Sequence, residues 1–308
     1  MGMVMAVQKN GTIAGDRAKA RNSMKTTTSF PPAAQITILI AGLAVLGAGL
    51  VWFAGRAPTS PAANANVPAA GGGQTDGLTV RTETFTEETP TVDVKVSYPQ
   101  VDGIVDISAG GGSAFGGEQA EMLNGELEST AIAWMDEFSR EVADTASPDP
   151  LGTKSTVDIS ATVAFVSPEV MSVRYDANVY SAGAAHPNLF YKTLNWNVVH
   201  AAEIRADDLF VNEADWITRF SELAIADLER QFADAGDDFE AMSTDIRAGA
   251  SAEADNFQAW TMDRDGITLH FEPYQVAAYA AGPQHVEIPW RALVSMLDVL
   301  GPAAYLTP

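Results

Sequence analysis

The feature that most constrains this chain is an uncharged apolar run at residues 36–54, ITILIAGLAVLGAGLVWFA. At about 1.5 Å per residue, a helix of this length extends roughly 28 Å, which is close to the roughly 30 Å core of a bilayer. Trp52 and Phe53 lie at its C-terminal end, where interfacial aromatic residues are preferred. The run therefore predicts a single transmembrane helix.

The charges that flank this run predict its orientation. Residues 1–35 contain five basic residues and one acidic residue, whereas Arg56 is the one basic residue close behind the run. The positive-inside rule then predicts a short cytoplasmic tail at 1–35, with the C-terminal part outside a bacterial cytoplasmic (inner) membrane, either periplasmic or extracellular. A cleaved signal peptide is the alternative, because residues 63–65 offer small side chains at a suitable spacing.

The charge beyond the tail is strongly acidic. Residues 36–308 contain 13 basic and 39 acidic residues, a net charge of −26. Such a surface repels nucleic acid and attracts cationic partners. The chain has no cysteine, which excludes disulfides, thiolate metal ligands and cysteine nucleophiles.

Composition and the periodicity of apolar residues divide the rest of the chain into a linker and two modules. Residues 55–84 begin with a stretch rich in Pro, Gly, Ala and Asn, and they are expected to form a flexible linker. Two ectodomain modules are expected to follow, at residues 85–188 and 189–305.

Helical and alternating patterns are mixed along these modules, which predicts an α+β fold of antiparallel sheets with packed helices, preceded by the transmembrane helix. The valines of TVDVKVSYP (91–99) alternate as in a half-buried strand. Apolar residues at three- and four-residue spacing predict helices over 118–144, 213–235 and 290–300. Antiparallel hairpins are expected over 156–181 and 257–274, and another strand is expected over 189–199.

The sequence predicts no catalytic residue, metal site or cofactor. Its four histidines show no HxxxH or HxH spacing, and no GxSxG motif or calcium loop is present. Aromatic and polar residues in expected loops are the better candidates for ligand binding. These residues are Tyr180, His186, Asn188, Tyr274 and Tyr279.

Three segments carry a resemblance to a known family: YSAGAAHPNLFYKTLNWNV (180–198), IRADDLF (204–210) and DGITLHFEPYQVAAYAAGPQHVEIPW (265–290). In this order they resemble the paired domains of unknown function in the ectodomain of RsiV-type lysozyme-sensing anti-sigma factors. The same pair precedes the catalytic domain of some peptidoglycan deacetylases. The resemblance implies a module that faces the cell envelope and has no catalytic activity of its own.

We therefore expect a single-pass membrane protein that presents a binding or sensing module to the envelope. A lysozyme-like cationic protein and peptidoglycan are the candidate ligands. The alternatives are a cell-wall hydrolase or deacetylase and a structural partner in envelope assembly. His186 discriminates between them: an exposed ring beside two carboxylates in a cleft favours an enzyme, and burial against backbone partners favours a binding module. Sigma-factor binding is not carried over, because residues 1–35 are short for such a segment.

Overall fold

The computed structural model describes residues 78–102, 117–145, 152–235 and 239–307, all within the unit that spans residues 62–308. The predicted tail and transmembrane helix, and most of the predicted linker, lie outside the described residues. None of the described helices combines the length and the apolar content that crossing a membrane demands.

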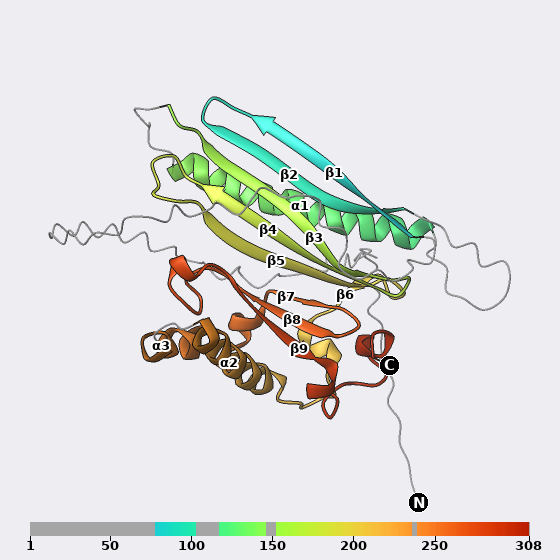
Figure 1. The fold of residues 1–308 in the computed structure, drawn as a ribbon. Helices are drawn as coiled ribbons and strands as arrows, with labels where there is room; N and C mark the ends of the chain where they lie inside the picture. The colour runs from blue at the N-terminus through green and yellow to red at the C-terminus, as the bar shows by residue number, and fades with distance from the viewer. Residues whose placement is uncertain (1–77, 103–116, 146–151, 236–238, 308) are drawn as a thin grey trace, which may run out of the picture. The chain divides into compact units, whose positions relative to one another are not determined.

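The first half of the described chain forms a six-stranded sheet in the order β1-β2-β3-β4-β5-β6 (Figure 1). Its strands are β1 (Thr79–Glu88), β2 (Val92–Asp102), β3 (Ser155–Val166), β4 (Val170–Tyr180), β5 (Asn188–Asn197) and β6 (Ala202–Glu203). Strand β1 begins inside the range that was expected to be linker. The predicted boundary between the two modules falls where β5 starts, and β5 pairs with β4 in this same sheet.

One helix, α1 (Gly117–Thr145), covers one face of this sheet. Leu123, Leu127 and Ala131 are fully buried on it, at the spacing that predicted this helix. They pack against alternate residues of the strands, such as Val96 and Ile159. The helix and the sheet thus enclose the first hydrophobic core.

The pairing of β2 with β3 is parallel, and α1 connects the two strands. The prediction of antiparallel sheets is wrong at this pair. A parallel pair needs a crossover of a dozen or more residues, and the long helix α1 supplies that crossover. The predicted β3–β4 hairpin is confirmed, with antiparallel register from Thr156↔Tyr180 to Val166↔Met171.

The second half forms a smaller antiparallel sheet in the order β7-β8-β9, covered by helices. Its elements are α2 (Trp216–Ala235), α3 (Phe239–Gly249), β7 (Trp260–Met262), β8 (Gly266–Phe271) and β9 (Gln284–Pro289), with short 3-10 turns between them. The predicted hairpin around Asp265-Gly266 is confirmed as β7–β8. Buried residues of both helices and all three strands form a second core.

The predicted helix over residues 290–300 is wrong. A 3-10 turn at Trp290–Ala292 is followed by irregular chain. The backbone N–H of Val211 donates to Met296 O, and that of Asp298 donates to Leu209 O. These bonds to a distant segment replace the bonds that a helix would have made, so tertiary contacts override the local pattern.

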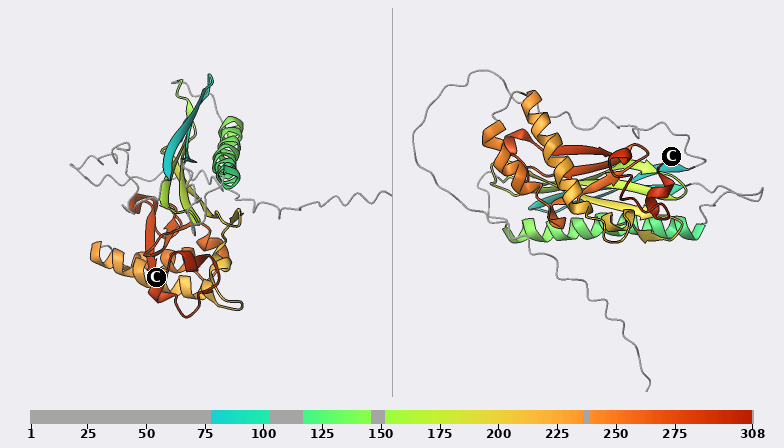
Figure 2. Two further views of the ribbon diagram at one scale, coloured as in Figure 1. Left: turned by 90° about the vertical axis from the view of Figure 1, so that its right-hand side faces the viewer. Right: turned by 90° about the horizontal axis from the view of Figure 1, so that it is seen from below.

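The face of β4 and β5 opposite α1 packs against β7. Ser172 on β4 donates its hydroxyl proton to Asn195 Oδ1 on β5 and accepts from the Met262 N–H on β7. Asn195 Nδ2 donates to Trp260 O at 2.9 Å. Figure 2 shows α1 and the smaller sheet on opposite sides of the large sheet. The two halves are therefore joined through buried polar groups.

A pair of glycine substitutions tests this packing. A Cβ at Gly249, the last residue of α3, would lie 1.7 Å from Gln275 O, whereas a Cβ at Gly125 in α1 has no atom within 4 Å. We expect Gly249→Ala to destabilise the fold by about 1–3 kcal/mol through overpacking. Gly125→Ala should stabilise it by about 0.5–1 kcal/mol, because alanine favours the helix.

The measurement is urea unfolding followed by circular dichroism. Equal effects of the two substitutions would contradict the close approach of α3 to residue 275.

Candidate functional site

A four-residue turn follows β8 and carries an exposed tyrosine. Pro273 and Tyr274 are its central residues, and the N–H of Gln275 donates to Glu272 O at 3.1 Å. Tyr274 has a φ of +73° and is 61% exposed. Proline followed by a residue at positive φ is typical of a type II turn, which favours glycine or asparagine at the second of these positions. A tyrosine there is strained, and such strain often marks a functional site.

Two further aromatic rings stack beside Tyr274. The ring of His186 lies 3.9 Å from that of Tyr279, centroid to centroid, and Tyr274 lies 5.4 Å from Tyr279 and 6.5 Å from His186. We call His186, Tyr274 and Tyr279 the aromatic platform. His186 comes from the loop between β4 and β5, whereas the tyrosines come from the segment between β8 and β9. The platform is therefore assembled from both halves of the chain.

Backbone contacts hold the platform in place. The hydroxyl of Tyr279 donates to Pro187 O at 2.9 Å, and His186 Nδ1 lies 2.9 Å from the same oxygen. His186 Nε2 lies 3.5 Å from the Tyr274 hydroxyl. The Nδ1–H tautomer of His186 satisfies both contacts, since it donates to the carbonyl and leaves Nε2 to accept.

Three of the five residues singled out from the sequence thus lie together. The other two lie at the adjoining strand ends: Tyr180 ends β4 opposite Thr156, and Asn188 begins β5 opposite Val179. Tyr180 is half-buried and Asn188 is exposed.

The turn that carries Tyr274 is anchored on both sides. Glu272 Oε1 accepts from the backbone N–H of Tyr191 on β5 at 2.8 Å. Gln275 Nε2 donates to Gly249 O at 3.1 Å and to Asn256 O at 3.0 Å. Strand β5 and the end of α3 therefore fix the position of Tyr274.

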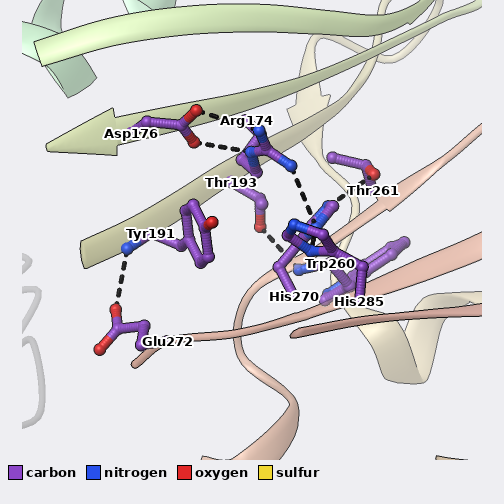
Figure 3. Close-up of polar contacts among 9 residues, drawn as sticks. All are labelled: Arg174, Asp176, Tyr191, Thr193, Trp260, Thr261, His270, Glu272 and His285. Atoms are coloured by element: carbon purple, nitrogen blue, oxygen red, sulfur yellow. Dashed lines mark hydrogen bonds and ion pairs between the residues drawn. The ribbon is translucent and has the colours of Figure 1, made fainter. Parts of the chain in front are cut away.

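A second cluster of side chains lies between the two sheets (Figure 3). We call it the polar joint, and its members are Arg174, Asp176, Tyr191, Thr261, His270 and His285. Arg174 forms a bidentate ion pair with Asp176, at 2.6 Å from Nε and 3.0 Å from Nη2. The guanidinium lies over the ring of Tyr191, 4.9 Å from its centroid.

The two histidines of the polar joint are directly opposite each other on β8 and β9. Their Nδ1 atoms lie 3.0 Å apart, and Arg174 Nη1 lies 3.3 Å from His270 Nδ1. His270 Nε2 lies 2.9 Å from the hydroxyl of Thr261. The contacts fit two neutral rings, in which His270 donates from Nε2 and accepts from both Arg174 and His285 at Nδ1.

Burial keeps these histidines neutral. It lowers the pKa of His270 to about 2, with smaller contributions from the positive charge of Arg174 and from His285. Burial and Arg174 likewise lower the pKa of His285 to about 4. Burial raises the pKa of Tyr191 to about 12 and also raises the pKa of the Glu272 carboxyl. These shifts suit structural hydrogen bonding, since a general acid or base needs a pKa near the working pH.

Two surface hollows lie at the opposite end of β5, on either side of residues 203–205. Their volumes are about 230 and 480 Å³. Glu203 and Arg205 line both of them. Arg205 is already ion-paired with Asp207 and Asp208. Across the described part of the chain, no three His, Asp or Glu residues converge as metal ligands.

The polar joint was not predicted from the sequence. The spacing of histidines along the chain does not reveal His270 and His285 as a pair, because they meet across two strands. The pairing register of β8 with β9 is the signal that would have brought them together. Arg174 and Glu272 carried no local signal, because their partners lie far away in sequence.

The histidine pair predicts loss of stability in acid. The unfolded chain binds protons near pH 6.5, whereas the folded histidines do so only near their lowered pKa values. Stability is therefore complete above pH 6.5 and falls as the pH drops towards 4, by on the order of 3 kcal/mol from His285 alone. Glu272 acts in the opposite direction, because its folded pKa is raised.

Urea unfolding between pH 7.5 and 4.5 measures this loss. His285→Gln should lessen this loss, and His270→Gln/His285→Gln should remove most of it, because burial lowers the pKa of both rings. His200→Gln, a change at an exposed histidine, should leave the loss as in the wild type. A steep acid loss that persists in the double variant would argue against the histidine pair.

Comparison with known proteins gives one family and two kinds of relative. Residues 207–291 match a family described as "Protein of unknown function (DUF3298)". Over 177 residues, 58% of this chain, the sequence is 24% identical to the peptidoglycan-N-acetylmuramic acid deacetylase PdaC of Bacillus subtilis. Over 117 residues, 38% of this chain, it is 26% identical to the immunogenic protein MPT64 of Mycobacterium tuberculosis. The alignments span 36% and 48% of these relatives, so this chain covers less than half of either.

Two crystal structures share the fold. DUF3298-family proteins of Bacteroides fragilis and Pseudomonas aeruginosa superpose with TM-scores of 0.53 and 0.51, at 16% and 12% identity. Each alignment covers 73% of this chain, and 96% or 97% of the other. The chain therefore has the α+β fold of these proteins, and its residues 207–291 are similar in sequence to the DUF3298 family.

Proposed function

We propose that this protein is a non-catalytic module that binds the glycan of peptidoglycan through the aromatic platform. One observation carries the proposal: Tyr274 is held exposed, at a backbone angle that favours glycine, beside two stacked rings. A residue kept under strain with its ring in solvent contributes little to the folding core. Ligand contact is the function that accounts for it.

The chemistry of the platform suits a sugar. A pyranose ring presents C–H bonds on one face and hydroxyl groups at its edge. The faces of Tyr274 and Tyr279 offer apolar surface to the C–H bonds of the sugar. The tyrosine hydroxyl oxygens can accept hydrogen bonds from its hydroxyl groups. The relative PdaC is named as a deacetylase of peptidoglycan, which supports this polymer as the ligand.

The surroundings of His186 favour binding over catalysis. Its ring is half-buried, stacks on Tyr279 and contacts a backbone carbonyl. The contacts described for this ring include no carboxylate, whereas a hydrolase or deacetylase needs an acid or metal beside its base. An enzymatic role is the alternative, and structural participation in envelope assembly is another.

The proposed location is the outer side of the bacterial cytoplasmic (inner) membrane. The apolar run at 36–54 and the basic residues before it support this topology. A membrane anchor of this kind would present the module to the cell wall.

Replacing Tyr274 tests the platform. Tyr274→Gly removes the exposed ring and relieves the positive φ, so the fold should remain as stable as the wild type or become more stable. Binding to insoluble peptidoglycan should fall about tenfold or more, because ring stacking is lost. A pull-down with purified sacculi and a melting curve provide the two measurements.

Tyr305→Ala is the matched control, since this tyrosine is 40% exposed and lines one of the hollows at residues 203–205. It should bind sacculi as the wild type does. Unchanged binding by Tyr274→Gly would rule out the platform as the binding site.

A cationic protein of the lysozyme type is a second candidate ligand, and helix α1 favours it. The solvent face of α1 is acidic, with Glu118, Glu121, Glu128, Asp136, Glu137 and Glu141 exposed. Burial, followed by the charge of Glu137, raises the pKa of Glu141. A cationic partner would relieve this repulsion between like charges and would associate faster at low salt.

Titration of the protein with hen lysozyme at 20 and 300 mM salt tests this second candidate. We expect saturable binding by the wild type that is weaker at the higher salt concentration. At the lower salt concentration, the Glu137→Gln/Glu141→Gln variant should bind more weakly than the wild type. The matched control is Glu87→Gln on β1. The absence of saturable binding at both salt concentrations would exclude a specific complex with lysozyme.

A further inference from the structure

The face of the large sheet opposite α1 continues beyond the smaller sheet. Strand β7 packs under the end of β3 and under β4 and β5, whereas no described helix or strand lies on this face of β1 and β2 (Figure 2). His186 of the platform lies in the loop that joins β4 to β5, so β3 and β4 connect the platform to the open part.

A straight row of polar side chains crosses this open face. Registers place Asn178 on β4 opposite Asp158 on β3, Asp158 opposite Lys95 on β2, and Lys95 opposite Thr86 on β1. We call these four residues the polar row. All four are exposed. Directly paired residues share a face of the sheet, and Asn178 lies on the same face as Arg174, towards the smaller sheet.

The row begins at the platform. Asn178 pairs with Leu189 on β5, close behind Pro187, whose carbonyl oxygen holds Tyr279 and His186. Neighbouring strands lie about 4.8 Å apart, so the row extends roughly 14 Å from β4 to β1. One strand spacing is close to the length of one sugar unit in an extended glycan.

No described residue forms a side-chain hydrogen bond or ion pair with the side chains of the row, which leaves them able to bind a ligand. Neighbouring charges on the sheet are engaged, since Lys154 pairs with Glu88 and Asp93, and Arg174 pairs with Asp176. Lys95 and Asp158 lie opposite each other, yet no ion pair joins them or ties either one to another described residue. Polar residues by themselves are ordinary on a solvated sheet face. Continuity with the platform is what distinguishes this row.

We propose that a glycan strand bound at the aromatic platform continues across β4, β3 and β2 along the polar row. This inference rests on the proposed function. Asp158 and Asn178 would accept hydrogen bonds from the acetamido N–H groups of the glycan, and the ammonium of Lys95 would pair with a carboxylate that the glycan carries. The row thus selects an N-acetylated, carboxyl-bearing polysaccharide longer than a disaccharide.

Calorimetric titration of the full-length chain with two length series tests the row. One series is N-acetylglucosamine oligomers of two to six units, and the other is peptidoglycan fragments of matched length. In the wild type, affinity should rise at least about tenfold from the shortest to the longest oligomer, as added hydrogen bonds contribute. Asp158→Ala/Asn178→Ala should abolish this rise and leave the affinity for the disaccharide unchanged.

Lys95→Gln should remove the preference for the carboxylated fragments over the uncharged oligomers of the same length. The control Glu87→Ala changes a neighbouring charge on the opposite face of β1 and should behave as the wild type. If the disaccharide binds and longer oligomers bind no tighter, the row is excluded and the platform stands. If no oligomer binds at any length, the platform and the row are both wrong.

Discussion

The structure depends on the way in which β4 and β5 are buried on both faces. One face is apolar and packs on α1, but the other carries Ser172, Asn195 and Arg174. Buried polar groups cost free energy unless they are hydrogen-bonded. The backbone of β7 and the side chain of His270 satisfy them, so the two sheets fit together in one arrangement. A purely apolar contact would specify that arrangement less strictly.

This fixed arrangement creates the platform. His186 belongs to the large sheet, and Tyr274 and Tyr279 belong to the smaller one, so the three rings meet only if the sheets are correctly docked. The bond from the Tyr191 N–H to Glu272 extends the same joint to the turn that exposes Tyr274. The strain of that turn is maintained by the surrounding packing, of which the close approach of Gly249 to Gln275 is one part. The candidate site is therefore a product of the interface between the halves.

The two faces of the large sheet, one covered by α1 and one partly open, present different chemical groups to solvent. Helix α1 presents carboxylates to solvent, whereas the opposite face of the sheet presents a mixed row of hydroxyl, ammonium, carboxylate and amide groups beside aromatic rings. Mixed neutral and charged groups on a flat surface suit a polar polymer, and a uniformly acidic helix suits a cationic protein. The two candidate ligands would thus use different faces.

The sequence by itself determined the elements whose signals are local. The spacing of Leu123, Leu127 and Ala131 specified α1, alternation specified β2, and turn residues specified the two hairpins. It also marked His186, Tyr274 and Tyr279 as candidates. Tertiary structure alone decided that β2 and β3 run parallel, that residues 290–300 form no helix, and that His270 meets His285. These outcomes depend on hydrogen bonds between residues far apart in the chain, whereas periodicity and propensity report only on neighbours.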